Sequence, residues 1–353
     1  RLGIHIAAPG LGISPESPAG LIARERLSTV YMPGNKITML PDEVVRAYSL
    51  DAGTARPAIS LYLDFDPATF AVRSSFSRVE QVPIAANLRH QQIESLNAVF
   101  EAGPDAPLPD LPYASELRTL HALAVVLATA RGDTGSNHDR AEYMFYVVDD
   151  RIQITERKRG APIDKLVAEL MILVNRSWGK LLADNDVAAI YRAQAQGKVR
   201  MTTAAGEHQG LGVSHYAWSS SPLRRFVDLT NQWQLIALLD GATPPFARNS
   251  ASLLGAIRDF ELTYAAYGEF QDKMEHYWCL RWLVQEGVTE TLATVVRESV
   301  VKFRDLPLYV RVPSLPPELQ PGTGVQVAVT GVDLIDSTVE VVFKSRLGGD
   351  APN

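Results

Sequence analysis

The stretch that decides the fold is Tyr216-Ala217-Trp218-Ser219-Ser220-Ser221-Pro222-Leu223-Arg224-Arg225-Phe226-Val227-Asp228. A serine run ahead of a proline is typical of a helix start, because serine caps the first turn and proline fits within it. We therefore predict a helix over residues 222–239. Free N–H groups at such a start attract anions, and Arg224 and Arg225 add planar donors that suit phosphate oxygens. On this local pattern alone, a helix cap with two surface arginines is an equally good interpretation.

Outward from this stretch, hydrophobic periodicity predicts long helices at residues 163–180 and 251–284, so the middle of the chain is mostly helical. Towards the N-terminus the pattern is mixed and indicates an α+β fold. There we predict strands at 58–64, 72–79 and 143–148, a helix at 116–129, and a hairpin turn at Asp149 and Asp150.

The character of the sequence changes after residue 286, where five short β-rich runs follow within about sixty residues. Such spacing favours an OB-type barrel. The runs are 290–297, 300–303, 308–312, 324–329 and 337–343. We therefore predict a large domain over residues 1–287, a small all-β domain over 288–346, and a tail at 347–353.

Composition is that of an ordinary enzyme, with 46% hydrophobic and 21% charged residues. No apolar run is long enough to span a bilayer, so we expect no membrane partner. A single cysteine, Cys279, and the lack of a leader favour a reducing cytoplasm. The net charge of −6 gives no sign of a nucleic-acid partner, so any basic surface must be local. Residues 1–7 read as a buried strand without a starting methionine, so we expect the chain to begin inside a domain.

Several catalytic signatures are missing from the sequence, namely the phosphate-binding P-loop, the G-x-S-x-G elbow, H-E-x-x-H and paired C-x-x-C. Their absence argues against P-loop, serine and zinc chemistry. Asp64 and Asp66 share one side of a predicted strand and are a conceivable metal pair. A turn role is the better interpretation, because Pro67 follows directly and aspartate is common at turns.

The quoted stretch resembles the T-S-P-I-R-R-Y-x-D-L signature of the ribonuclease II/R (RNB) family. Other segments resemble family motifs in family order, as far as about Trp282. They are residues 28–34 and 39–41 (S-V-Y-L-P … M-L-P), 48–50 (C-S-L), 87–90 (R-L-x-Y), 169–175 (E-x-M-x-x-A-N) and 208–212 (H-x-G-L-G). The resemblance implies an RNB-type catalytic domain, a mixed sheet with long helices, followed by an S1-like OB-fold barrel that binds RNA.

The resemblance also implies a function, the hydrolytic 3′→5′ degradation of single-stranded RNA to nucleoside 5′-monophosphates. Tyr31 and Phe145 then stack on the terminal bases, which holds any base without reading its identity. His90 stands where the family has a ribose-contacting tyrosine and can still bond a 2′-hydroxyl. Arg224 matches the catalytic arginine at the scissile phosphate. The predicted RNA-binding residues are Tyr31, His90, Phe145, Glu169, Ser221, Arg225 and Gln271.

The sequence also departs from the family pattern. Family members use two Mg²⁺ ions held by a D-x-D-D-A cluster, which would lie upstream of Arg1 and is not in this chain. The family H-I-A-D reads His5-Ile6-Ala7-Ala8, so a further carboxylate is missing, and no ligand to the metal is predicted within the chain. The family's long insertion is reduced to residues 193–207, and Gln271 stands at the position of a family glutamate.

These departures keep an alternative open, a non-catalytic single-stranded RNA-binding protein of the same fold. A helical interaction scaffold without affinity for RNA is a third and weaker interpretation. We expect the protein to be monomeric.

Overall fold

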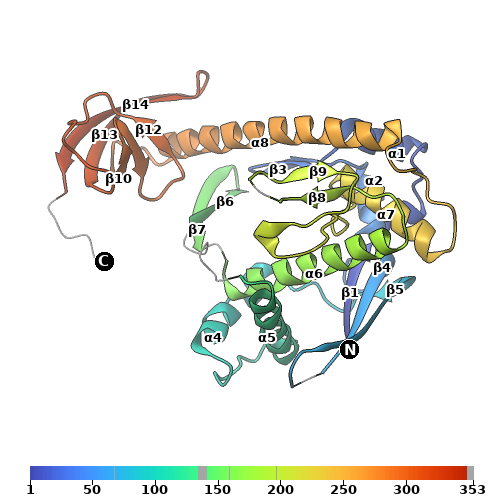
Figure 1. The fold of residues 1–353 in the computed structure, drawn as a ribbon. Helices are drawn as coiled ribbons and strands as arrows, with labels where there is room; N and C mark the ends of the chain where they lie inside the picture. The colour runs from blue at the N-terminus through green and yellow to red at the C-terminus, as the bar shows by residue number, and fades with distance from the viewer. Residues whose placement is uncertain (67, 134–140, 159, 196, 348–353) are drawn as a thin grey trace. The chain divides into compact units, whose positions relative to one another are not determined.

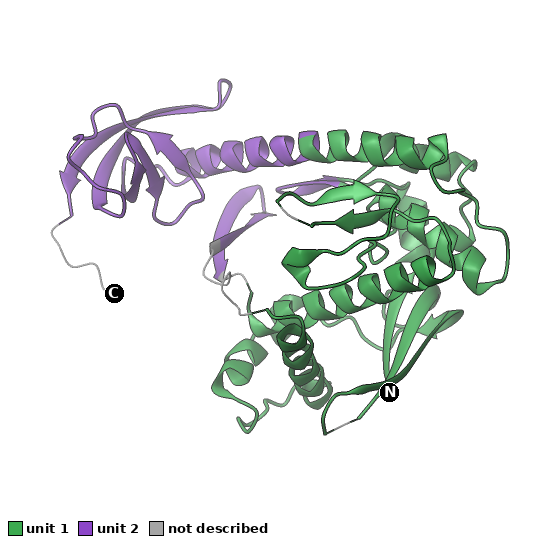
Figure 2. Ribbon diagram, viewed as in Figure 1, with its two compact units in different colours: residues 1–29, 37–139, 160–265 green, residues 30–36, 140–159, 266–353 purple. Residues whose placement is uncertain are grey.

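The structure is a computed structural model that describes residues 1–66, 68–133, 141–158, 160–195 and 197–347. The chain divides into two compact units (Figure 2). Unit 1 holds residues 1–29, 37–139 and 160–265, and unit 2 holds residues 30–36, 140–159 and 266–353. The predicted domain boundary between residues 287 and 288 stays a prediction. Within the described ranges, no helix is long and apolar enough to cross a lipid bilayer.

Unit 1 contains an antiparallel three-stranded sheet in the order β1-β4-β5 (Figure 1). The strands are β1 (Leu2–Ala7), β4 (Ala55–Phe65) and β5 (Val72–Pro83). Ile4 pairs with Leu61 and Ile6 with Ile59, and all four side chains are buried in one hydrophobic cluster. Alternation along the strands thus directs one face of the sheet to the core. The predicted strands at 58–64 and 72–79 are confirmed.

The helices of unit 1 include α5 (Ala114–Ala130) and α6 (Pro162–Asp184), which confirm the helices predicted from periodicity. Leu173, Val174 and Trp178 of α6 are buried in the same cluster as the sheet's inner face. Shorter elements complete the unit. They are η1 (Pro9–Leu11), α1 (Pro18–Arg26), α2 (Asp42–Tyr48), α3 (His90–Ile93), α4 (Leu96–Ala102), η2 (Gln209–Leu211), and the paired strands β8 (Tyr191–Ala193) and β9 (Arg200–Thr202).

Helix α7 (Phe226–Leu239) begins four residues later than predicted, so the prediction of a helix from residue 222 was wrong at its start. The carbonyl of Ser221 accepts the N–H groups of both Arg224 and Arg225 at 3.1 Å, which closes a tight turn. Arg225 then has an extended backbone (φ −137°, ψ 127°) and caps the helix. Proline therefore lies in the turn before the helix and not in its first turn.

Helix α7 is buried along most of its length, although five of its buried residues are polar, namely Asp228, Thr230, Asn231, Gln232 and Gln234. Three long amides on it bond to the backbone of other segments. Asn231 accepts the Ile190 N–H at 2.7 Å, Gln232 donates to the Ala7 carbonyl at 2.8 Å, and Gln234 donates to the Ala188 carbonyl at 2.7 Å. Because buried polar groups are costly unless bonded, these amides fasten several loops to one helix.

Unit 2 contains a five-stranded antiparallel sheet in the order β12-β11-β10-β13-β14, which is curled in Figure 1. Its strands are β10 (Glu290–Arg297), β11 (Val300–Phe303), β12 (Tyr309–Arg311), β13 (Gly324–Asp333) and β14 (Thr338–Arg346). All five predicted strands are confirmed, whereas their assignment to an S1-like OB barrel stays a prediction. Of the predicted tail, residues 348–353 lie outside the described residues.

Two further ribbons belong to unit 2. Strands β6 (Ala141–Val148) and β7 (Arg151–Lys158) form the predicted hairpin, with positive φ angles of 50° and 58° at Asp149 and Asp150. Strands β2 (Val30–Met32) and β3 (Asn35–Ile37) form a second hairpin, of which only the last residue, Ile37, falls in unit 1. Helix α8 (Ala251–Gln285) confirms the last predicted helix, and its residues fall in both units.

Candidate nucleic-acid interface

Arg224 lies at the end of the turn that precedes α7, and its side chain is exposed. Its backbone is fixed, because its carbonyl accepts the Thr29 N–H at 3.0 Å and the Ser28 hydroxyl at 3.3 Å. Within the described part of the chain, its guanidinium makes no hydrogen bond or ion pair. The structure therefore presents a free cation on an anchored backbone, which suits contact with an anion from solution.

Arg225 and Ser221 are held by the carboxylate of Asp228. Arg225 donates to both carboxylate oxygens at 2.7 Å, and Ser221 donates its backbone N–H to one of them at 2.9 Å. The side chains of Arg225 and Asp228 are 10% and 0% exposed. This buried pair gives Arg225 a structural role that the sequence did not predict, and its contact with RNA stays a prediction, as does that of Ser221.

Trp218 connects this pair to a second arginine that the sequence analysis missed. The guanidinium carbons of Arg192 and Arg225 each lie 3.9 Å from the centre of the Trp218 ring. One indole ring thus makes cation–π contacts with two guanidinium groups. Burial lowers the pKa of Arg192, whose Nε is buried without a partner among the described residues. A tryptophan inside the quoted motif was the available signal for this stack.

Glu169 lies on α6 in a buried ion pair with Arg131. Its oxygens accept two hydrogen bonds from the guanidinium, one of them at 3.1 Å from Nε. The side chains of Arg131 and Glu169 are 7% and 4% exposed, respectively. Arg131 also donates to the carbonyl of Leu211. Gly212 has a φ of 62°, and a Cβ there would lie 2.2 Å from the Arg131 carbonyl oxygen, so only glycine fits. The contact of Glu169 with RNA stays a prediction.

His90 is the first residue of α3 and belongs to unit 1. Its Nε2 is buried and has no hydrogen-bond partner among the described residues. A buried ring nitrogen without a partner is costly, so a hydroxyl from a ligand would stabilise it. This placement is compatible with the predicted 2′-hydroxyl contact, which the structure leaves as a prediction.

Tyr31, Phe145 and Gln271 belong to unit 2. Tyr31 lies on β2 and is 43% exposed, and its backbone carbonyl accepts the side-chain amide of Gln271 at 3.1 Å. Phe145 lies on β6 and packs, partly buried, against the hydrophobic cluster of the five-stranded sheet. The structure thus brings Tyr31 and Gln271 together and leaves one free aromatic ring and one packed ring. Their stacking on RNA stays a prediction.

The described residues do not fit a pair of magnesium ions. They contain no group of three or more His, Cys, Asp or Glu side chains that could hold a metal. Ala8 is fully buried at the end of β1, among Ile4, Ile6 and Ile59. Asp66 accepts the N–H groups of the turn that follows it, and Asp64 is bonded to Arg1 at 2.9 and 3.1 Å, so neither is free to bind a metal.

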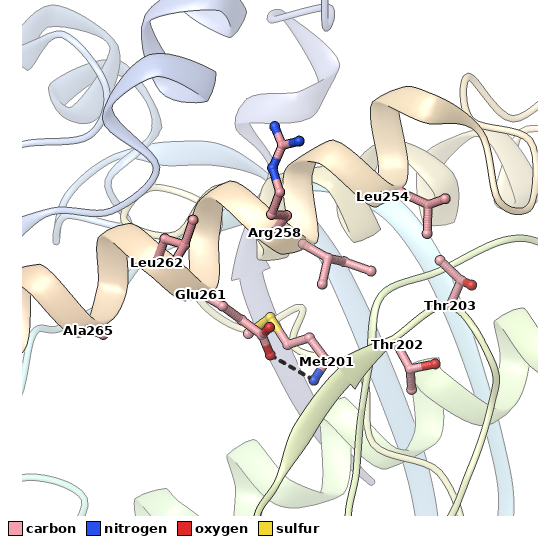
Figure 3. A pocket seen from close by; sticks show the side chains of 9 residues that line it. Met201, Thr202, Thr203, Leu254, Arg258, Glu261, Leu262 and Ala265 are labelled. Atoms are coloured by element: carbon pink, nitrogen blue, oxygen red, sulfur yellow. Dashed lines mark hydrogen bonds between the residues drawn. The ribbon is translucent and has the colours of Figure 1, made fainter.

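A groove of about 550 Å³ lies in unit 1 between β9 and the first half of α8 (Figure 3). Met201 of β9 donates its backbone N–H to Glu261 of α8 at 3.1 Å, which ties the shortened 193–207 segment to the helix. Most of its lining side chains are apolar, including Leu254, Ile257 and Leu262. Its polar lining consists of Thr202, Thr203, Arg258 and the carboxylate of Glu261, and that carboxylate would repel a phosphate.

Comparison with known proteins gives a consistent result. The model of the RNB domain family matches residues 1–203 and 193–241. Exoribonuclease 2 of Edwardsiella piscicida is 28% identical over 306 residues, and the match covers 68% of this chain and 46% of that protein. The chain thus spans less than half the length of this curated relative.

Two solved structures share the fold. RNase R of Mycoplasma genitalium, in complex with ribose-methylated single-stranded RNA, has a TM-score of 0.76 at 14% identity. The match covers 97% of this chain and 66% of the RNase R chain. Yeast Ssd1, a pseudonuclease, has a TM-score of 0.66 at 16% identity, and the match covers 93% of this chain and 48% of the Ssd1 chain. Identities this low show similarity of fold alone.

Proposed function

The chain belongs to the RNB domain family of ribonuclease II-type exoribonucleases, and from this premise we propose that it degrades single-stranded RNA hydrolytically from the 3′ end, with release of nucleoside 5′-monophosphates. Arg224 is the observation that carries the proposal, because its guanidinium is exposed and unpaired on a backbone anchored to residues 28 and 29. The partner would be single-stranded RNA, and we propose a cytoplasmic monomer.

Arg224 would act on the scissile phosphate. Negative charge grows on the phosphate oxygens as a water molecule attacks, and a positioned guanidinium stabilises that charge more in the transition state than in the bound substrate. The Arg225–Asp228 pair supports this role indirectly, since it holds the turn that ends at Arg224. The magnesium ions that hydrolysis would require are proposed to be held by aspartates upstream of Arg1, because the described residues do not fit them.

The alternative is a non-catalytic protein that binds single-stranded RNA. Ala8 favours it, because this position is fully buried and apolar where the family pattern has a carboxylate. Likeness in fold to a pseudonuclease is compatible with it. The two functions differ in turnover and share RNA binding, so one assay separates them.

The test is the cleavage of a 3′-hydroxyl oligoribonucleotide by the full-length protein. With Mg²⁺ we expect shortening from the 3′ end, and addition of a chelator should stop it. Full activity in chelator would contradict the two-metal mechanism. Tight binding without product at any Mg²⁺ concentration would favour the alternative function, and absence of both would exclude both proposals.

Loss of the Tyr31 ring should weaken RNA binding by about 1–3 kcal/mol, the scale of one base stacked on an aromatic side chain. Because Tyr31 is exposed, Tyr31→Ala should leave the melting temperature nearly unchanged. Phe145→Ala should weaken binding and lower stability together, since this ring packs on a hydrophobic cluster. The measurements are RNA affinity, melting curves and the length of the final product. Unchanged end products and affinity in Tyr31→Ala would remove Tyr31 from the site.

A further inference from the structure

A second pocket of unit 1 lies between the middle of α6 and the segment that follows η2. Its volume is about 330 Å³, at the lower end of small-molecule sites, which span roughly 300–1,000 Å³. It is lined by Arg176, Ser177, Lys180, Gly212, Val213 and Ser214. None of these residues was predicted to bind RNA. Val213 is the one aliphatic side chain in this lining, which otherwise consists of two basic residues, two serines and a glycine. The lining therefore differs from the apolar groove beside β9.

Arg176 is the charged group that defines this pocket. It is half-buried, and its guanidinium makes no hydrogen bond or ion pair with the described residues. Burial lowers its pKa, and so does the charge of Arg131, while Glu169 acts in the opposite direction. Glu169 is already engaged by Arg131 through both oxygens. The single negative charge of Glu169 therefore lies near two guanidinium groups and is bonded to that of Arg131. The positive charge of Arg176 is left without a bonded counter-charge.

The other polar groups of the pocket are donors. Ser177 follows Arg176 on α6, and its hydroxyl has no partner among the described residues. Lys180 lies one turn further along the same helix and is bonded to Asp184 at 2.6 Å on the exposed surface. Ser214 lines the pocket from the segment after η2, and its hydroxyl lies 3.0 Å from Nδ1 of the neighbouring His215. A planar guanidinium with neighbouring hydroxyls matches the oxygens of a phosphate group, and a carboxylate to repel the anion is absent from the lining.

We propose that this pocket binds a phosphate group through Arg176, with Ser177, Lys180 and Ser214 as further donors. Burying a cation without a counter-charge is unfavourable, and a bound phosphate removes that penalty. The phosphate can belong to an RNA backbone or to a free nucleotide, which offer the same chemistry. This inference stands on the pocket alone and does not require that the protein cleave RNA.

Binding of inorganic phosphate, adenosine 5′-monophosphate and a single-stranded oligoribonucleotide to the full-length protein tests the proposal, by calorimetry at constant ionic strength. In Arg176→Gln we expect at least about tenfold weaker binding of one or more of these ligands, the scale of losing a charge-assisted hydrogen bond. Arg46→Gln is the matched control, because Arg46 lies exposed on α2 and the change in net charge is the same. It should bind all three as the wild type does.

Comparison of the three ligands identifies the source of the phosphate. A loss confined to the oligoribonucleotide indicates a backbone phosphate, and a loss with inorganic phosphate or the nucleotide indicates a free anion. Equal binding of all three ligands by wild type, Arg176→Gln and Arg46→Gln would overturn the proposal, whatever the outcome of the cleavage assay. Lys180→Gln is a second variant, exposed and thus tolerant of change, and should weaken the same ligand less. If Arg176 has only a structural role, Arg176→Gln should have a lower melting temperature and should bind all three ligands as the wild type does.

Discussion

Replacement of Arg224 by alanine should lower the rate of RNA cleavage by the full-length protein by about 10²–10³-fold, the scale for loss of one donor to a developing oxyanion. RNA affinity should fall far less, because the remaining phosphate contacts are unchanged. The structure adds a reason to expect a clean result. The guanidinium is exposed and unpaired within the described residues, so its removal leaves no buried partner unsatisfied and the melting temperature should hold.

Arg224→Lys should rescue poorly, because an ammonium cannot reproduce the two parallel hydrogen bonds of a guanidinium. Arg46→Ala serves as the control for the loss of one exposed arginine from unit 1 and should keep the full rate. Single-turnover rates, RNA affinities and melting curves of the four proteins decide the matter. Near-normal turnover in a well-folded Arg224→Ala protein would remove this residue from the proposed mechanism.

Asp228→Asn should destabilise unit 1 by about 3–5 kcal/mol, the usual result of removing one partner from a buried ion pair. The carboxylate is fully buried and accepts both guanidinium bonds of Arg225 and the Ser221 N–H. An amide keeps the volume but cannot neutralise Arg225. The turn that carries Arg224 should loosen as well, so cleavage should fall along with stability. Denaturant unfolding, followed by tryptophan fluorescence, measures the change.

The control is Asp186→Asn, the same substitution in an ion pair with Arg248 whose side chains are 90% and 54% exposed. Exposed pairs contribute at most about 1 kcal/mol, so this variant should unfold near the wild-type midpoint. An unfolding free energy of Asp228→Asn close to that of Asp186→Asn would show that the Arg225–Asp228 pair does not stabilise the turn.

Local periodicity was sufficient for most of the elements. The strand at 58–64 places Ile59, Leu61 and Leu63 in one buried cluster at every second position, and α6 repeats its apolar residues at helical spacing, so both could be predicted from neighbours in sequence. The start of α7 could not, because Ser-Pro fits a turn and a helix start equally well. What decides between them is Asp228, whose side chain binds Ser221 from within the helix.

The sequence singled out Arg224 by itself, and the structure shows its side chain exposed, while its role in the candidate site stays a prediction. Pairs formed across long separations gave no local signal. Arg131 and Glu169 lie 38 positions apart, and the oppositely charged residue at helical spacing from Glu169 is Lys165, so the local pattern points to a different partner. The same holds for Arg192, which meets Trp218 only after the chain has folded. Glycine 212 was recognised as part of a motif, while its reason, the Arg131 carbonyl, lies far away in sequence.

The side-chain hydrogen bonds of α7 have a consequence for folding during translation on the ribosome. Gln232 holds the carbonyl of Ala7, 225 positions earlier, and also the Gly10 N–H, while Trp233 holds the carbonyl of Ile13. At about 5–20 residues per second, α7 is translated roughly 10–45 s after the segment that it fastens. Residues 7–13 must wait that long without their polar partners, open to proteases and chaperones. Nascent chains stalled before residue 226 should be cut in this segment, and chains stalled well beyond residue 239 should resist.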